Sequence, residues 1–173
     1  MFINLTDYFE VQGKQAELKI PYESEAFNNG YEELPILKKD DLKLSIVNIG
    51  DGKLSLSGEM AVTLQSACSR CLKPVEISVP ISFEYSVVKP DGYHEIDEDE
   101  QYFMNGYELD AETLINNELI MCLPMKVLCE DDCKGLCPVC GKNLNEGDCG
   151  CDTFVPDPRM AAISDIFNAY KEV

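Results

Sequence analysis

The chain has 173 residues, 45% of them hydrophobic, and 14 Lys and Arg against 32 Asp and Glu give it a formal net charge of −18. The length and apolar content suit one domain with a hydrophobic core plus a small appendage. The charge disfavours a broad nucleic-acid-binding face, because neutralising phosphates requires clustered Lys and Arg. The N-terminus lacks the pattern of a signal peptide, and no stretch reaches the roughly 18 apolar residues of a membrane span. We therefore expect a cytoplasmic protein whose partner is basic.

The first 41 residues give weak signals. Apolar and polar residues alternate over residues 16–22, which predicts a half-buried strand. The acidic stretch from Glu23 to Glu33 contains Asn and Gly and is interpreted as a loop.

The strongest pattern is a set of long alternating segments after residue 41. Residues 42–47 alternate, Gly50-Asp51-Gly52 supplies a reversal, and residues 54–65 alternate again, so a β-hairpin is predicted. Residues 75–87 repeat the pattern, with one face apolar and the other polar. The expected fold class is α+β, with a twisted antiparallel sheet or a partly open β-barrel, a covering helix, a Cys-rich module and a terminal helix.

Acidic residues dominate the next stretch, and Asp97, Glu98, Asp99 and Glu100 are its densest part. Such a run is usually a solvated loop. The sharper hypothesis is a docking surface for a basic partner. The single histidine, His94, lies at the edge of this stretch and is expected to be a surface residue.

Residues 110–121 predict a helix that covers the sheet. Asp110 suits the N-cap, and Leu114, Ile115 and Leu119 share one face. Cys122 continues that apolar stripe and is expected to be buried. Near the C-terminus, Asp157 and Pro158 predict the start of a second amphipathic helix that packs on the sheet or on a partner.

Six of the nine cysteines fall in the polar segment 129–151, which has too few apolar residues for a core of its own. Either disulfides or a metal held by thiolates must fix it, and a reducing compartment favours metal. The CPVCG motif has the form of a zinc knuckle, and a CxC pair follows it after a turn-rich loop. This spacing predicts a first Zn²⁺ site of Cys137, Cys140, Cys149 and Cys151, with iron as the other metal left open.

A second pair of cysteines lies between the two long strands, where a tight turn would suffice. Two thiolates are two ligands short of a tetrahedral site, which leads us to expect a second site of Cys68, Cys71, Cys129 and Cys133. The competing hypothesis is that Cys68 and Cys71 are free thiols, either inert or redox-active in the manner of a CxxC disulfide, although the redox motif usually opens a helix.

These segments together resemble the YceD family, bacterial proteins linked to accumulation of large-subunit ribosomal RNA, with relatives in plastids. The resemblance is carried by CSRCL after a long strand, by LCEDDCKGLCPVCGKNLNEGDCGC and by the closing DPRMAAISDIF. Some family members have the strand-end CxxC without the knuckle cysteines, which implies two separate metal sites. The resemblance also implies a non-enzymatic role in ribosome biogenesis.

Two classes of function follow. The first is a ribosome-biogenesis adaptor, in which one or two structural Zn²⁺ ions stiffen residues 126–173 and an acidic β-rich body, residues 1–125, engages a basic ribosomal protein, an assembly factor or a pre-ribosomal particle. Direct RNA binding is the less favoured version. The second is a thiol redox protein or a zinc-dependent enzyme. The sequence contains no HExxH and no Gly-rich phosphate loop, which disfavours the second class.

Overall fold

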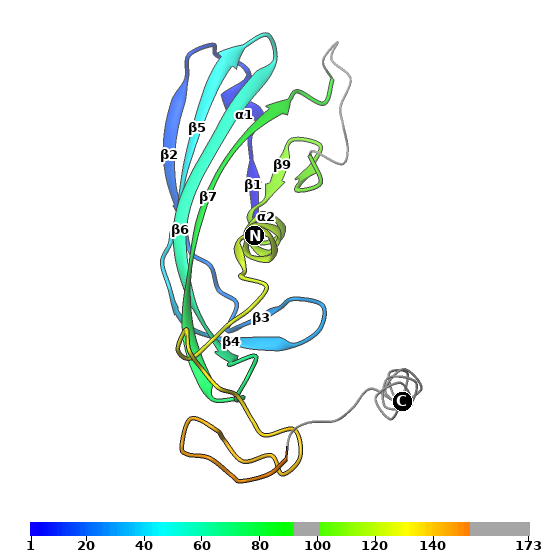
Figure 1. Ribbon diagram of the computed structural model, residues 1–173. Coiled ribbons are helices and arrows are strands. Elements are labelled where there is room, and N and C mark those ends of the chain that lie inside the picture. The colour runs from blue at the N-terminus through cyan, green and yellow to red at the C-terminus, as the bar shows by residue number, and fades with distance from the viewer. Residues whose placement is uncertain (92–100, 153–173) are drawn as a thin grey trace, which may run out of the picture.

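The computed structural model describes residues 1–91 and 101–152. Its main element is an antiparallel sheet of six strands, which bends around a helix without closing into a barrel (Figure 1). The strands are β2 (Gln15–Ile20), β3 (Ala26–Asn28), β4 (Glu33–Lys39), β5 (Leu42–Gly50), β6 (Lys53–Ala67) and β7 (Pro74–Val88). The expected antiparallel sheet with a covering helix is confirmed.

The sheet is organised around β6. Strand β7 pairs with it along its whole length, from Lys53 opposite Val88 to Ala67 opposite Pro74. On its other side, β6 pairs first with β5 and then, beyond Glu59, with β4. The remaining strands lie outside these, so the order is β2-β5-β6-β4-β3 with β7 beside β6.

Alternation along the strands separates a buried from a wet face, as the sequence predicts. In β6 the even-numbered residues from Leu54 to Leu64 are buried, and their odd-numbered neighbours are more exposed. In β7, Val79, Ile81, Phe83 and Val87 are buried on the same side. Because side chains alternate across a strand, one pattern places the whole core on the inner, concave face.

The interpretation of residues 23–33 as a loop is wrong in part. Ala26–Asn28 forms β3 and pairs with the first residues of β4, and the reversal between them is held by the side chain of Asn29, which accepts from the backbone N–H groups of Tyr31 and Glu32. Phe27 and Leu34 are almost fully buried in this hairpin. Two anchors so few residues apart do not make a visible period, although they suffice to bury a short strand.

A small second sheet and α2 fill the concave side. Strands β1 (Phe2–Asn4), β9 (Glu108–Asp110) and β8 (Met104–Asn105) form the small sheet, and a short helix, α1 (Thr6–Phe9), follows β1. Helix α2 (Ala111–Cys122) packs against β7 through buried side chains that include Leu114, Ile115 and Leu119. Within the described residues, no helix has the length and apolar character needed to cross a membrane.

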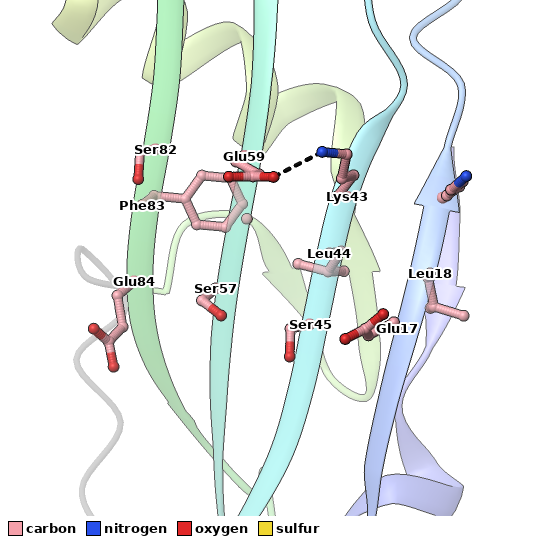
Figure 2. A pocket seen from close by; sticks show the side chains of 12 residues that line it. Glu17, Leu18, Lys43, Leu44, Ser45, Ser57, Glu59, Ser82, Phe83 and Glu84 are labelled. Carbon is pink, nitrogen blue, oxygen red and sulfur yellow. Dashed lines mark hydrogen bonds and ion pairs between the residues drawn. The ribbon is translucent and has the colours of Figure 1, made fainter.

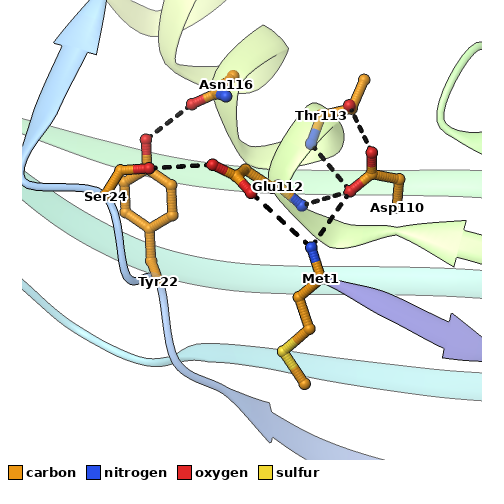
Figure 3. Close-up of polar contacts among 7 residues, drawn as sticks. All are labelled: Met1, Tyr22, Ser24, Asp110, Glu112, Thr113 and Asn116. Carbon is orange, nitrogen blue, oxygen red and sulfur yellow. Dashed lines mark hydrogen bonds and ion pairs between the residues drawn. The ribbon is translucent and has the colours of Figure 1, made fainter.

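Polar contacts join the start of α2 to distant parts of the chain (Figure 3). The side chain of Asp110 caps the helix by accepting from the backbone N–H groups of Glu112 and Thr113, at 3.2 and 3.5 Å. The N-terminal amine of Met1 lies 3.5 Å from Asp110 and 3.8 Å from Glu112. One turn further on, the hydroxyl of Tyr22 donates to Asn116 at 2.7 Å. The beginning of α2 is therefore tied both to the small sheet and to the segment after β2.

The end of α2 differs from expectation. Cys122, predicted to be buried, is exposed, as are Ile120 and Met121, because this last turn of the helix has no covering element among the described residues. The buried stripe instead includes Glu118, whose carboxylate accepts a 2.5 Å hydrogen bond from the hydroxyl of Tyr85 on β7. A buried polar group needs a hydrogen-bond partner, so Glu118 joins α2 to β7 by a directional hydrogen bond at a position where an apolar contact would be usual.

Three predictions concern residues outside the described ranges. They are the acidic cluster Asp97, Glu98, Asp99 and Glu100, the neighbouring His94, and the terminal helix from Asp157.

Candidate metal centres

The eight cysteines of the two predicted sites come together in two groups of four. The inner cluster is Cys68, Cys71, Cys129 and Cys133, and the outer cluster is Cys137, Cys140, Cys149 and Cys151. Within each cluster all four sulfur atoms lie within 4.8 Å of one another. All nine cysteines of the chain are free thiols, so the clusters are not disulfide pairs. Each cluster could hold a metal ion.

The inner cluster lies at the end of the long β6–β7 hairpin. Cys68 follows the last residue of β6, and its backbone N–H donates to the carbonyl of Lys73 at 2.8 Å, which closes the turn that carries Cys71. Leu72 within this turn has a positive φ of 60°. Such backbone strain is uncommon outside Gly and Asn and persists only where the surroundings hold it. The turn therefore presents two thiols to one point.

The other two thiols of the inner cluster arrive on the segment after α2. The backbone N–H of Ser69 donates to the carbonyl of Val127 at 2.8 Å, and the N–H of Val127 donates back to the Ser69 hydroxyl. The guanidinium of Arg70 donates to the carbonyl of Cys133 at 2.7 Å. These contacts fasten the Cys-rich segment to the hairpin end. Cys68, Cys71 and Cys133 are buried as a result, with Leu128 and Leu136 packed around them.

The outer cluster is built mostly from tight turns. The N–H of Gly141 donates to the carbonyl of Cys137 at 2.9 Å, and the positive φ of 73° at Gly141 closes the CPVCG turn. Cys137 is buried, whereas Cys140 is exposed. The outer cluster thus lies nearer the solvent than the inner one.

Backbone amides favour the thiolate form of Cys68 in the inner cluster and of Cys137 in the outer cluster. Burial opposes ionisation of Cys68, but N–H groups of Cys71, Arg70 and Cys129 bond its sulfur and together lower its pKa to about 6. The N–H groups of Cys140 and Val139 act similarly on Cys137 and lower its pKa to about 6. Hydrogen bonds from these amides offset part of the free-energy cost of holding a negative sulfur away from water.

One other thiol in each cluster, Cys129 in the inner and Cys151 in the outer, strongly resists ionisation because negative sulfur is already close. The neighbouring sulfur of Cys71, together with burial, raises the pKa of Cys129 to about 12. The sulfur of Cys140, followed by that of Cys149, raises the pKa of Cys151 to about 12. Four thiolates packed this closely need a cation among them to be stable, which is the electrostatic requirement that a metal ion meets.

A second feature, without cysteine, lies on the outer face of the sheet. A shallow hollow of about 830 Å³ crosses β2, β5, β6 and β7. Figure 2 shows three short serine side chains, Ser45, Ser57 and Ser82, among the longer charged side chains that line it. Lys43 and Glu59 form a 2.8 Å ion pair across it. The other carboxylates that line it are those of Glu17 and Glu84.

The sequence patterns did not indicate the residues that hold the clusters in place. Arg70 stands between Cys68 and Cys71 and bonds the backbone of the opposite half of the inner cluster. Asn145 belongs to the loop of the outer cluster, yet its amide nitrogen lies 3.2 Å from the sulfur of Cys133. The position of Arg70 inside the CxxC motif was a weak indication of its role. Asn145 is one of several turn-forming residues in its loop, and nothing in the sequence distinguishes it from the others.

Comparison with known proteins places these features in a family. A model of the family described as "Large ribosomal RNA subunit accumulation protein YceD" matches residues 56–167, which include most of β6 together with β7, α2 and both cysteine clusters. No solved structure matches the chain significantly.

The chain is also similar to curated proteins of mycobacteria. An uncharacterized protein of Mycobacterium bovis and uncharacterized proteins of two Mycobacterium tuberculosis strains are each 32% identical to it over 106 residues, which is 60% of this chain and 51% of theirs. The chain therefore spans about half the length of the curated relatives it matches. Since the family model covers well over half of the chain, the protein belongs to the YceD family, the family of large ribosomal RNA subunit accumulation proteins.

Proposed function

We propose that the protein is a non-enzymatic ribosome-biogenesis factor, a zinc-stabilised acidic adaptor that promotes accumulation of large-subunit ribosomal RNA by binding a basic partner. The observation that carries the proposal is a pair of four-thiolate clusters within the region that matches the YceD family. We infer a cytoplasmic location, because a reducing compartment keeps such thiols available for metal.

Zinc is the metal that these clusters suit best. Four sulfurs bound tetrahedrally to one Zn²⁺, each at about 2.3 Å, lie about 3.8 Å from one another. In the inner cluster the sulfurs of Cys68 and Cys133 are 3.8 Å apart and those of Cys71 and Cys129 are 3.5 Å apart. Thiolate-only donor sets favour Zn²⁺ over Mg²⁺, Ca²⁺ or Mn²⁺, which prefer oxygen ligands.

A structural role for the metal follows from the number of ligands. Catalytic zinc sites keep one position open for water or substrate, whereas a site of four cysteines is closed. A bound Zn²⁺ would supply folding energy to a segment that has few apolar contacts, rather than a nucleophile. A redox or hydrolytic function of the CxxC cysteines would instead require at least one thiol to be free of metal.

The negative charge supports a basic partner, such as a ribosomal protein, an assembly factor or part of a pre-ribosomal particle. The net charge is −18, and each zinc with four thiolates adds about −2 more. We propose two parts with separate tasks, a β-rich body of residues 1–125 that offers carboxylates to the partner and a metal module of residues 126–173. The hollow with Glu17, Glu59 and Glu84 is one candidate contact, and the acidic cluster from Asp97 to Glu100 is another.

Depletion of the protein in its own host tests the biological role. We expect the amount of large-subunit ribosomal RNA to fall relative to small-subunit ribosomal RNA, and plasmid-borne wild-type protein to restore it. A Cys68→Ser variant should restore less than a Cys122→Ser variant, because Cys122 is exposed and belongs to neither cluster. An unchanged ratio of the two RNAs after complete depletion would refute the proposed role.

Affinity capture at increasing ionic strength tests the adaptor model. Basic ribosomal proteins or assembly factors should be enriched at low salt and lost as salt rises, because attraction between exposed charges is screened. The control bait is an unrelated acidic protein of similar net charge. Equal recovery of the same proteins by both baits would show that the capture is unspecific.

A further inference from the structure

The two cysteine clusters are physically connected through one side chain. Asn145 lies in the loop between Cys140 and Cys149 of the outer cluster, and its amide nitrogen is 3.2 Å from the sulfur of Cys133 in the inner cluster. Its amide oxygen accepts from the backbone N–H of Lys134 at 2.7 Å. Since that N–H can only donate, the oxygen must face it and the NH₂ group must face the sulfur.

The position of Asn145 depends on the fold of its loop. The N–H of Leu144 donates to the carbonyl of Gly135 at 2.9 Å, and Asn143 pairs with Leu136 in an isolated β-bridge. Gly135 in turn lies directly against Arg70, because a Cβ there would come within 3.0 Å of the Arg70 carbonyl oxygen. The loop of the outer cluster is therefore stacked on the segment that carries Cys133 and, through it, on the turn that carries Cys68 and Cys71.

We infer that Asn145 is a positioning residue that couples the two metal sites, so that an ion in the outer cluster tightens the hold of the inner cluster on its own ion. This inference rests on the proposed metal binding. An ion bound to Cys140 and Cys149 joins the two ends of the loop, which removes most of the conformational freedom that would carry Asn145 away from Cys133. With the loop closed, the amide N–H bonds the ligand sulfur and helps to hold its orientation.

The expected size of the coupling comes from the general behaviour of groups that bond metal ligands. Loss of a group that hydrogen-bonds a metal ligand typically lowers the metal affinity by about 10- to 100-fold. Coupling is reciprocal, so an ion in the inner cluster must also tighten the outer cluster by the same factor. The two sites then fill and empty together rather than independently.

The test uses the full chain loaded with zinc and counts the ions that remain per chain by native mass spectrometry as a competing chelator is added. Asn145→Asp keeps the oxygen that accepts from Lys134 but replaces the N–H donor with a negative oxygen beside the Cys133 sulfur. We expect this variant to lose zinc from the inner cluster at a chelator concentration that is lower than for wild type by a factor of about ten or more. Lys134→Gln, which leaves the backbone N–H in place, is the matched control and should behave like wild type.

A Cys140→Ser background isolates the inner cluster and completes the argument. In that background the inner site should already be weakened, and adding Asn145→Asp should change it little, because the loop no longer delivers Asn145. If Asn145→Asp retains zinc as wild type does, the residue serves only the loop backbone and the inference is overturned. If wild type itself binds no zinc, the proposed metal sites fail instead, so the two failures are distinguishable.

Discussion

Gly58 shows how a single residue limits what the sheet can accept. It lies opposite Phe83 of β7 in the register, and a Cβ at this position would lie 2.8 Å from Cε1 of the Phe83 ring and closer still to Cζ. Real Cβ atoms do not approach carbon so closely, so the ring or the strand would have to move. The missing side chain of Gly58 therefore leaves room for the Phe83 ring on the buried face of β6, although glycine lowers the strand propensity at this position.

We predict that Gly58→Ala destabilises the sheet by about 1–3 kcal/mol, the usual cost of overpacking a core. Urea unfolding followed by circular dichroism measures the change. Ser57→Ala, one residue away and on the wet face, is the control and should change stability by about 0.5 kcal/mol or less. A Phe83→Leu background should reduce the cost of Gly58→Ala. Equal costs in both backgrounds would show that the ring is not the obstacle.

At the scale of an element, α2 depends on Asp110 for its first turn. Burial alone would raise the pKa of Asp110, but hydrogen bonds from Thr113 and the charge of the N-terminal amine outweigh it and lower the pKa below its ordinary value. A carboxyl whose pKa is lowered by folding stabilises the folded state at pH values above its unfolded pKa. That stability is lost as the pH falls through the lower, folded value.

Asp110→Ala should therefore lower the free energy of unfolding by about 1 kcal/mol at pH 7, the typical cost of losing an N-cap. The difference from wild type should persist at neutral pH and begin to shrink below about pH 4, where the carboxyl of the unfolded chain protonates. It should disappear as the pH falls through the lower pKa of the folded carboxyl. Asp110→Asn keeps a capping oxygen without the charge and should cost less. Chemical unfolding at several pH values measures both variants. A difference that grows as the pH falls would contradict the assignment.

At the scale of the whole molecule, two separate groups of buried side chains hold the chain together. The large core lies between the main sheet, α2 and the small sheet, whereas the inner cysteines form a group of their own with Val75, Leu128 and Leu136. The second group is too small to fix residues 128–151 by apolar burial. Under the proposed function, metal ions held by the two cysteine clusters would order that segment.

Removal of metal by a strong chelator under reducing conditions should accordingly unfold one part of the chain and spare the other. Backbone amides of residues 128–151 should lose protection in hydrogen exchange, while those of β5, β6 and β7 keep it. Added Zn²⁺ should restore the protection, and added Mg²⁺ should not, because it binds thiolates poorly. A metal-free protein that keeps residues 128–151 protected would refute a structural role for the metal.

The features that could be predicted from the sequence are those with a short repeat. The alternation in β5, β6 and β7, the Asp110 cap of α2 and the outer cysteine cluster depend on spacing between residues that are close in the chain. The inner cluster joins two distant cysteine pairs, and it was predicted because each pair lacked two of the four ligands of a tetrahedral site. The hairpin of β3 and β4 escaped prediction because its two buried anchors, Phe27 and Leu34, form no period. The prediction that Cys122 is buried was wrong because the apolar spacing continues to the end of the helix, whereas the last turn of α2 is not covered by another described element.

By itself, then, the sequence determined which residues of β5, β6 and β7 face inward and which cysteines form the two groups of four, because these follow from the strand period and from the four ligands that a tetrahedral metal site requires. Only the tertiary structure decided that β4 and β5 share one side of β6, that Glu118 is buried under Tyr85, and that Asn145 reaches Cys133. Such contacts join residues far apart in the chain or in separate turns. They form only when separate elements pack against one another, so the spacing of residues within one element does not predict them.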